Sequence, residues 1–304
     1  MKKRSFGTTG LRVSELGMGC NRLGEPGMLD AHWVALVHRA IDLGVNLFDT
    51  SESYQWGDSE EVLGRAIGNN PDVYVATKVS RVRETNEKDF SADRVIERAE
   101  QSLKRLRREC IDIFQLHSPS LENMQQYDWP EAMTRLKQQG KIRVAAVSIN
   151  DAESALWLIE NDLVEALQVP FNIIEHQVGH EIFPIAAEAG VGTMIRMPMA
   201  QGILTGKFSP VSQVDKGHRA LMAGKKMMPY IERAAELGPL AEECGMPLAI
   251  LALKYAISPH GVSTAIPGAR SFEQLEQNVA ASDGKELTEA IVNRIEVMQA
   301  GWEA

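Results

Sequence analysis

Residues 45–79, VNLFDTSESYQWGDSEEVLGRAIGNNPDVYVATKV, contain two strand-like runs with a helix-like run between them. VNLF and DVYVAT are short and mostly apolar, which is typical of strands buried on both faces of a parallel sheet. SEEVLGRAIG has acidic residues in its first turn, where a helix favours them. The stretch therefore predicts a β-α-β unit whose two strands end near Asp49 and Lys78.

The same alternation of strand and helix continues along the chain. After SELGMG (14–19) and the two strands above, further strand-like runs occur at IDIFQL (111–116), RVAAV (143–147), VEALQV (164–169), GTMIR (192–196) and VSTAI (262–266). Eight such units fit a (β/α)8 TIM barrel better than an open doubly wound sheet. RSFGTTGLRVSEL (4–16) predicts an N-terminal β-hairpin. Since no linker or composition shift divides the chain, we expect one domain, residues 1–304.

The composition limits the partners that the chain could have. A net charge of −9 with a pI near 5.4 argues against a nucleic-acid binder, which needs a basic face. The best apolar run, MPLAILALKYAI, is too short for a membrane span and contains Lys254. The N-terminus lacks the apolar stretch of a secretory signal, and three scattered cysteines are typical of reduced thiols. We therefore expect a cytoplasmic protein with no nucleic-acid or membrane partner.

Polar residues follow the predicted strands at the point where each strand ends. In a barrel these ends form the face that carries the active site, so the side chains should converge there. Singly, each is more often a cap or a solvated group than a functional residue. As a set, a functional interpretation dominates. The residues are Asp49, Lys78, His117, Ser148, Gln168 and Arg196.

Tyr54, five residues after Asp49, suggests the chemistry of this set. A free tyrosine titrates near 10, and a neighbouring Lys78 ammonium would lower that pKa. An ionised Asp49 would keep Lys78 charged and aimed, and His117 could orient a carbonyl oxygen. Together these residues predict a proton donor for an oxygen that gains negative charge.

Such a donor needs a partner that attacks the carbonyl carbon, and no Ser–His or Cys–His nucleophile is evident. We expect no metal, because His176 and His180 in HQVGH lack further ligands nearby. A hydride-bearing cofactor would fill the gap. No Rossmann fingerprint is present, but PMAQGILTGKF (198–208) and IPGARSFEQLEQN (266–278) have the Gly, Lys and Arg content of a phosphate-binding surface. For the second stretch, ordinary helix capping by Ser271 remains an equal alternative.

Several of these motifs, in order, resemble the aldo-keto reductases over essentially the whole chain. They are GTTGLRVSELGMG, GVNLFDTSESYQWGDSEEVLGRAI, VYVATKV, IDIFQLHSP, VSIN, ALQVPFN, PMAQGILTGKF and IPGARSFEQLEQN. The resemblance implies a (β/α)8 barrel and NADPH-dependent reduction of an aldehyde or ketone to an alcohol. Tyr54 would be the general acid, supported by Lys78 and Asp49, and His117 would orient the substrate.

The resemblance also implies the cofactor contacts. Asp49, Ser148 and Gln168 would hold the nicotinamide end, Gly202, Leu204 and Lys207 the pyrophosphate, Gly268 and Arg270 the adenosine phosphate, and Gln274 and Asn278 the adenine. The chain departs from the family where Ile149 replaces an Asn that often follows the serine. It departs again at Arg196, where the family often has an aromatic residue on the nicotinamide; the planar guanidinium would stack instead. Arg270 favours NADPH over NADH.

Other interpretations stay open. Some proteins of this fold are cofactor-binding regulatory subunits of channels with little turnover, and a barrel hydrolase or isomerase is a third possibility. The complete set of Asp49, Tyr54, Lys78 and His117 favours an enzyme. We expect Trp56, His117, Trp129 and the segment 208–229 to line the substrate pocket. Its cations could favour an anionic substrate or simply be solvated, and we favour solvation; they are His218, Arg219 and Lys225. The substrate and the oligomeric state are not identified by the sequence.

Overall fold

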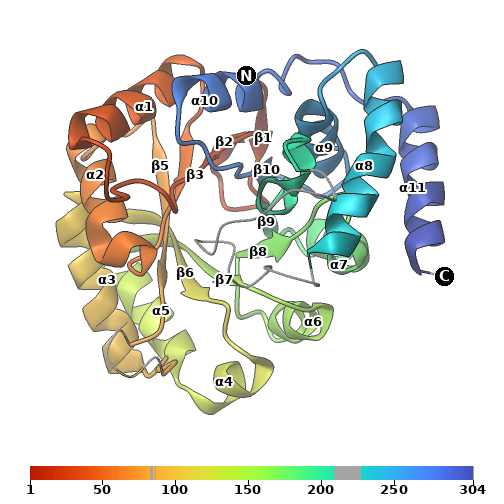
Figure 1. Cartoon of the computed structure of the whole chain (residues 1–304). Helices are drawn as coiled ribbons and strands as arrows, with labels where there is room; N and C mark the ends of the chain where they lie inside the picture. Colours follow the sequence, from red (N-terminus) through yellow and green to blue (C-terminus); the bar gives the residue numbers. More distant parts are fainter. Residues whose placement is uncertain (83–84, 86, 209–226, 304) are drawn as a thin grey trace.

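The computed structural model of the chain describes residues 1–82, 85, 87–208 and 227–303 (Figure 1). Eight parallel strands form one sheet in the order β10-β9-β8-β7-β6-β5-β4-β3. Two parallel bridges, Leu16 to Ala265 and Gly19 to Gly268, join the first and last of these strands. The sheet is therefore a nearly closed barrel, as the alternating pattern predicted.

The barrel strands are β3 (Met18–Gly19), β4 (Leu47–Asp49), β5 (Tyr74–Val79), β6 (Ile111–His117), β7 (Ile142–Ser148), β8 (Ala166–Pro170), β9 (Gly192–Arg196) and β10 (Thr264–Ala265). The helices are α1 (Asp30–Asp42), α2 (Asp58–Ala66), α3 (Ala92–Leu106), α4 (Leu121–Gln126), α5 (Trp129–Gln138), α6 (Ala152–Glu160), α7 (Gln177–Glu188), α8 (Met228–Glu243), α9 (Leu248–Ile257), α10 (Phe272–Val279) and α11 (Glu289–Glu303). Two short 3-10 helices, η1 (Tyr54–Gly57) and η2 (Ala200–Thr205), follow β4 and β9. In Figure 1 the helices surround the strands.

The predicted hairpin closes the N-terminal end of the barrel. It consists of β1 (Lys3–Ser5) and β2 (Arg12–Ser14), which pair antiparallel with Lys3 opposite Ser14. Phe6 and Val13 are fully buried and pack in one cluster with inward-facing residues of the barrel strands, such as Ile113. This plug of apolar side chains fills the barrel interior at its N-terminal end.

Alternation along the strands explains which residues face the interior at that other end. Side chains two residues apart share one face of a strand. The apolar layer at the base contains Leu47, Ala76, Ile113, Ala146, Ala166 and Met194. Two residues further along each strand stand Asp49, Lys78, Gln115, Ser148, Gln168 and Arg196. The barrel interior is therefore apolar at the N-terminal end and polar at the C-terminal end.

The helices follow the sequence pattern with small shifts at their ends. On α3 the residues Val95, Ala99, Leu103 and Leu106 are buried along one face. Helix α4 was not predicted; it is only six residues long, and Ser120 and Asn123 form a capping box at its start. Most of the segment 208–229, with His218, Arg219 and Lys225, lies outside the described residues. Within the described part of the chain, no helix has both the length and the apolar character to cross a bilayer.

Candidate active site

Asp49 and Lys78 form a buried ion pair at the C-terminal ends of β4 and β5. The Lys78 Nζ lies 2.8 and 2.7 Å from the two Asp49 carboxylate oxygens and 2.7 Å from the Thr50 carbonyl oxygen. Lys78 is fully buried and Asp49 is 2% exposed. Burial opposes the charged form of Lys78, but Asp49 and Tyr54 together outweigh that cost, and the pKa of the Lys78 ammonium is raised. The pair therefore places a fixed positive charge inside the barrel.

Two glutamines complete the hydrogen bonding of Asp49. Gln168 Nε2 donates to Asp49 Oδ1 at 2.8 Å, and Gln115 Nε2 donates to the same oxygen at 3.2 Å. Ser148 stands behind Gln168, and its hydroxyl donates to Gln168 Oε1 at 3.2 Å. Sequence reasoning missed Gln115, although it stands two residues before His117 on the same strand and hence on the same face. The network fixes the Asp49 carboxylate from three strands.

Tyr54 stands in η1, directly after β4, and its ring lies against Lys78. The Lys78 Nζ is 5.0 Å from the centroid of the Tyr54 ring. Burial raises the pKa of the Tyr54 phenol above its ordinary value; the Lys78 ammonium acts in the opposite direction without cancelling the rise. Lys78 lowers the pKa of the phenol as expected, but the net shift is upward, because desolvation is the larger effect and the Asp49 carboxylate adds to it. Tyr54 is protonated at neutral pH.

His117 ends β6 and faces Tyr54. The two rings lie edge to face, with centroids 5.7 Å apart. Its Nδ1 lies 3.1 Å from the Ser51 hydroxyl. Burial, followed by the positive charge of Lys78 and Arg196, lowers the pKa of His117 well below 6.5. The imidazole is therefore neutral, and if Ser51 donates to Nδ1, the proton of the ring is on Nε2.

A cavity of about 540 Å3 opens at this end of the barrel and is here named the C-terminal cavity. Of the predicted site residues, it is lined by Asp49, Tyr54, His117, Gln168, Arg196, Gly202, Lys207, Gly268, Arg270, Gln274 and Asn278. Lys78, Ser148 and Leu204 do not line it, because they are buried behind its wall. Cys20, Asn21 and Arg22 also line it, from the loop after β3, where no motif in the sequence indicated a site.

The two tryptophans expected in the substrate pocket lie elsewhere. Trp129 is fully buried at the start of α5, where its indole donates to the Met124 carbonyl oxygen at 3.0 Å. The prediction for Trp129 was therefore wrong, because the connection after β6 turns this residue into the core. Trp56 is 48% exposed and does not line the C-terminal cavity. Its contact with substrate stays a prediction.

The far end of the cavity lies between η2 and the start of α10. Gly202, in η2, has φ = 93°, a conformation that favours glycine. The Ser271 hydroxyl caps α10 by accepting from the Gln274 N–H at 3.2 Å. Asn278 Nδ2 donates to the Gly268 carbonyl oxygen at 3.1 Å. The capping alternative is thus confirmed, while the cofactor contacts of this helix stay predictions.

Arg196 brings a second cation to the reacting end of the cavity. Its Nη2 donates to the Ile149 carbonyl oxygen at 3.0 Å and to Asn150 Oδ1 at 2.9 Å. Its Nε is buried without a hydrogen-bond partner. Among the described residues, no carboxylate forms an ion pair with this guanidinium. Asn150, one position beyond the site where the family often has its Asn, thus holds Arg196 in place.

The arrangement suits protonation of an oxygen that gains negative charge. It offers a protonated phenol and a neutral imidazole beside a buried ammonium, at the wall of the C-terminal cavity. In the described part of the chain, no three His, Cys, Asp or Glu side chains gather to hold a metal ion.

Several known proteins are similar to this chain in sequence or in fold over most of its length. A probable voltage-gated potassium channel subunit beta from Oryza sativa subsp. japonica is 30% identical over 98% of this chain and 96% of its own. A NADH-specific methylglyoxal reductase from Escherichia coli (strain K12) is 27% identical over 92% of this chain and 93% of its own. The solved holo form of an aldo-keto reductase from Bacillus halodurans is 29% identical, with a TM-score of 0.83 over 98% of this chain and 96% of its own.

The model of the Aldo/keto reductase family matches residues 15–300, from just before β3 to the last turn of α11. That match includes all eight barrel strands and every predicted site residue. This chain therefore belongs to the aldo-keto reductase family of oxidoreductases.

Proposed function

We propose that this chain reduces an aldehyde or ketone to an alcohol with NADPH, and that Tyr54 is the proton donor. The main support is the position of the Tyr54 phenol. It is protonated at neutral pH, lies against the buried Lys78 ammonium and faces the same cavity as His117. A weak acid placed beside a fixed positive charge can release its proton to an oxygen only as that oxygen becomes basic.

The residues of the C-terminal cavity fit a nicotinamide dinucleotide. Lys207 lines the cavity and forms no ion pair with any described residue, so its charge is available to a phosphate. Bound along this cavity, the reduced cofactor would supply the hydride that the protein lacks. Ser148 and Gln168 would position the nicotinamide end; Gly202, Leu204, Lys207, Gly268, Arg270, Gln274 and Asn278 would hold the rest. Arg270 lines the cavity; to bind the adenosine phosphate and favour NADPH over NADH, it would exchange its 3.1 Å ion pair with Glu25 for the phosphate.

In the proposed reaction the phenol proton of Tyr54 moves to the carbonyl oxygen of the substrate. The Lys78 ammonium stabilises the phenolate that forms, and Asp49 keeps Lys78 charged throughout. His117, with the proton on Nε2, would donate a hydrogen bond to the same oxygen and fix its direction. Gln115 and Gln168 keep the Asp49 carboxylate from turning away from Lys78.

Tyr54→Phe tests this proposal, because it removes the proton and keeps the ring. We expect kcat for aldehyde reduction to fall by about 10²- to 10⁴-fold, while the Kd for NADPH, measured by fluorescence titration, stays the same. Since the pKa of Tyr54 is raised above 10, the wild-type rate should hold up to about pH 9 and decline only above pH 10. Tyr74→Phe, half-buried on β5, is the matched control and should leave kcat intact.

The similarity to a protein named as a probable potassium channel subunit beta supports a second candidate function, that of a cofactor-binding regulatory subunit. A regulatory subunit would bind NADPH but turn over slowly. If wild type and Tyr54→Phe bind NADPH and are equally slow with a panel of aldehydes, this second function is the correct one. The same titrations with NADH would show which cofactor is preferred.

A further inference from the structure

Positive charge surrounds the point where a substrate carbonyl would lie. Lys78, Arg196, Lys88 and Arg81 all lower the pKa of His117, so each is near enough for its charge to be felt at this imidazole. The Lys88 ammonium donates to the carbonyl oxygen of Ser118, a residue that lines the C-terminal cavity. Of these cations, Lys78 has its carboxylate partner, Asp49, inside the barrel.

Arg196 is the cation of this group that enters the cavity wall without a counter-charge. Asp49 is occupied by Lys78, at 2.7 Å. Glu175 is near enough to influence Arg196, but it accepts hydrogen bonds from the Tyr230 hydroxyl at 2.9 Å and from Asn172 Nδ2 at 3.2 Å, and forms no ion pair with Arg196. Tyr54 is protonated and carries no charge. The guanidinium thus remains half-buried and uncompensated among the described residues, with its Nε unsatisfied.

A bound cofactor would not neutralise this charge. The negative charges of a nicotinamide dinucleotide are on its phosphates, and the cations proposed for them, Lys207 and Arg270, line the other end of the cavity. Stacking on a nicotinamide ring would give the face of the Arg196 guanidinium a packing contact, but it would not neutralise its charge. Leaving a buried charge unpaired is costly, so an anion from the remaining ligand is favoured.

We propose that the carbonyl substrate carries an anionic group, a carboxylate or a phosphate, which binds Arg196. This inference rests on the proposed function and assigns its substrate class. The chemistry is otherwise unchanged: the carbonyl carbon gains the hydride of the reduced cofactor, the carbonyl oxygen gains the Tyr54 proton, and the anionic group does not react. Arg196 is suited to this contact because its fork donates two parallel hydrogen bonds to a carboxylate or phosphate.

Matched substrates test the inference with the full chain and NADPH. One pair is 4-carboxybenzaldehyde and 4-methylbenzaldehyde; the other is glyceraldehyde 3-phosphate and glyceraldehyde. In wild type we expect kcat/KM for the anionic member of at least one pair to exceed that of the neutral member by about tenfold or more. Arg196→Met should lower this ratio by about tenfold or more. The substrate pair whose ratio falls in Arg196→Met shows whether the anionic group that Arg196 binds is a carboxylate or a phosphate.

Arg143→Met is the control, because Arg143 stands near the other end of β7 and pairs with Asp112 at 3.1 Å. In this variant the ratio of kcat/KM for the anionic member to kcat/KM for the neutral member should equal that of wild type. A wild-type ratio near one, or an Arg196→Met variant that loses both members of a pair equally and binds NADPH more weakly, would overturn the inference and assign Arg196 to the cofactor.

A binding measurement separates this inference from the proposed function. Calorimetric titration of the NADP-loaded chain with benzoate and with inorganic phosphate needs no turnover. We expect Arg196→Met to raise the Kd of at least one of these anions by about tenfold. If no aldehyde is reduced but this loss is seen, the anion site stands and the proposed reaction fails. If neutral aldehydes are reduced but neither anion binds through Arg196, the reaction stands and the anion site fails.

Discussion

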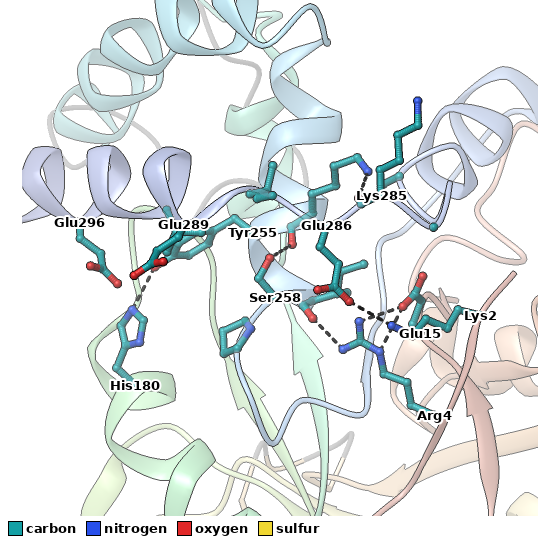
Figure 2. A pocket seen from close by; sticks show the side chains of 17 residues that line it. Lys2, Arg4, Glu15, His180, Tyr255, Ser258, Lys285, Glu286, Glu289 and Glu296 are labelled. Atoms are coloured by element: carbon teal, nitrogen blue, oxygen red, sulfur yellow. Dashed lines mark hydrogen bonds and ion pairs between the residues drawn. The ribbon is translucent and has the colours of Figure 1, made fainter.

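The protein has two cavities of similar size, and the two differ in how their buried polar groups are satisfied. The C-terminal cavity holds Tyr54 and His117. A second cavity of about 440 Å3, the N-terminal cavity, lies between the start of β1, the end of α9 and the segment that leads into α11 (Figure 2). There Arg4 pairs with Glu15 at 2.8 Å, Lys2 with Glu286 at 3.1 Å, and Lys254 with Asp283.

The polar groups at the floor of the N-terminal cavity are also satisfied by one another. The Tyr255 hydroxyl lies 2.9 Å from His180 Nε2, and Gln299 Nε2 donates to it at 3.0 Å. At the C-terminal cavity, by contrast, Arg196 Nε and Gln115 Oε1 are buried without partners. Two cavities of similar size therefore differ in their buried polar atoms: the Tyr255 hydroxyl of the N-terminal cavity has partners within the protein, whereas Arg196 Nε of the C-terminal cavity has none.

Removing Lys78 should have the largest effect, since it breaks the one ion pair that the proposed reaction uses. Lys78→Met leaves the Asp49 carboxylate buried without a counter-charge. We expect the free energy of unfolding to fall by about 3–5 kcal/mol in urea titrations. We expect kcat to fall by about 10²- to 10⁴-fold in steady-state assays, because the Tyr54 phenolate loses its stabilising charge.

Lys254→Met is the matched control from the N-terminal cavity. Lys254 is buried like Lys78, but its partner Asp283 is 41% exposed in its side chain and can turn to water. The variant should therefore keep kcat within about twofold. A similar loss of activity in both lysine variants would show that the two cavities are not independent.

Arg4→Met should be less damaging and should act on stability alone. The change leaves Glu15, 3% exposed, with the Ser282 hydroxyl as a hydrogen-bond donor. It also removes the Arg4 donor to the Ile257 carbonyl oxygen, 2.7 Å away. We expect a loss of about 2–4 kcal/mol in the free energy of unfolding. We expect kcat/KM to change by less than about twofold, since the C-terminal cavity is at the other end of the barrel.

Lys2→Met controls for the general effect of removing a cation there, because Lys2 and Glu286 are 51% and 78% exposed in their side chains. It should change stability by less than about 0.5 kcal/mol. If Arg4→Met lowered kcat/KM as strongly as Lys78→Met, the separation of a structural end from a reactive end would be wrong.

The polar face of the barrel could be predicted from the sequence because it depends on local pattern. Asp49, Lys78 and His117 each end an apolar run, and parallel register brings all such ends to one rim. Gln115 could not be found this way, since inside an apolar strand it looks like a single polar interruption. Its importance lies in a 3.2 Å contact with Asp49, 66 residues away.

Burial is the other property that the sequence did not reveal. The charge of Lys78 beside Tyr54 was predicted, but the depth of the phenol, which reverses the net pKa shift, depends on everything packed around it. The prediction that Trp129 lines the substrate pocket was wrong for the same reason, because the sequence did not show that this residue is buried. The pairing of Arg270 with Glu25 joins the two ends of the sheet, a contact that no local pattern encodes.

Two histidines, His117 at the C-terminal cavity and His180 at the N-terminal cavity, give the smallest of these effects and the finest comparison between the cavities. Burial lowers the pKa of His117 well below 6.5 and lowers that of His180 less. A histidine kept neutral in the folded state takes up its proton only on unfolding. Stability is therefore unaffected above about pH 6.5 and falls as the pH drops from 6.5 towards the lower, folded pKa.

For His117 this loss should reach about 1 kcal/mol between pH 7.5 and pH 5.5. Urea titrations at these two values should show that His117→Asn removes most of this contribution from the pH dependence. His180→Asn should remove less, because its neighbour Glu296 raises the pKa that burial lowers. An unchanged pH dependence in His117→Asn would mean that the folded protein does not lower the pKa of His117. The imidazole would then be charged below about pH 6.5 and donate from both ring nitrogens, so the neutral orienting role proposed for it would not hold at those pH values.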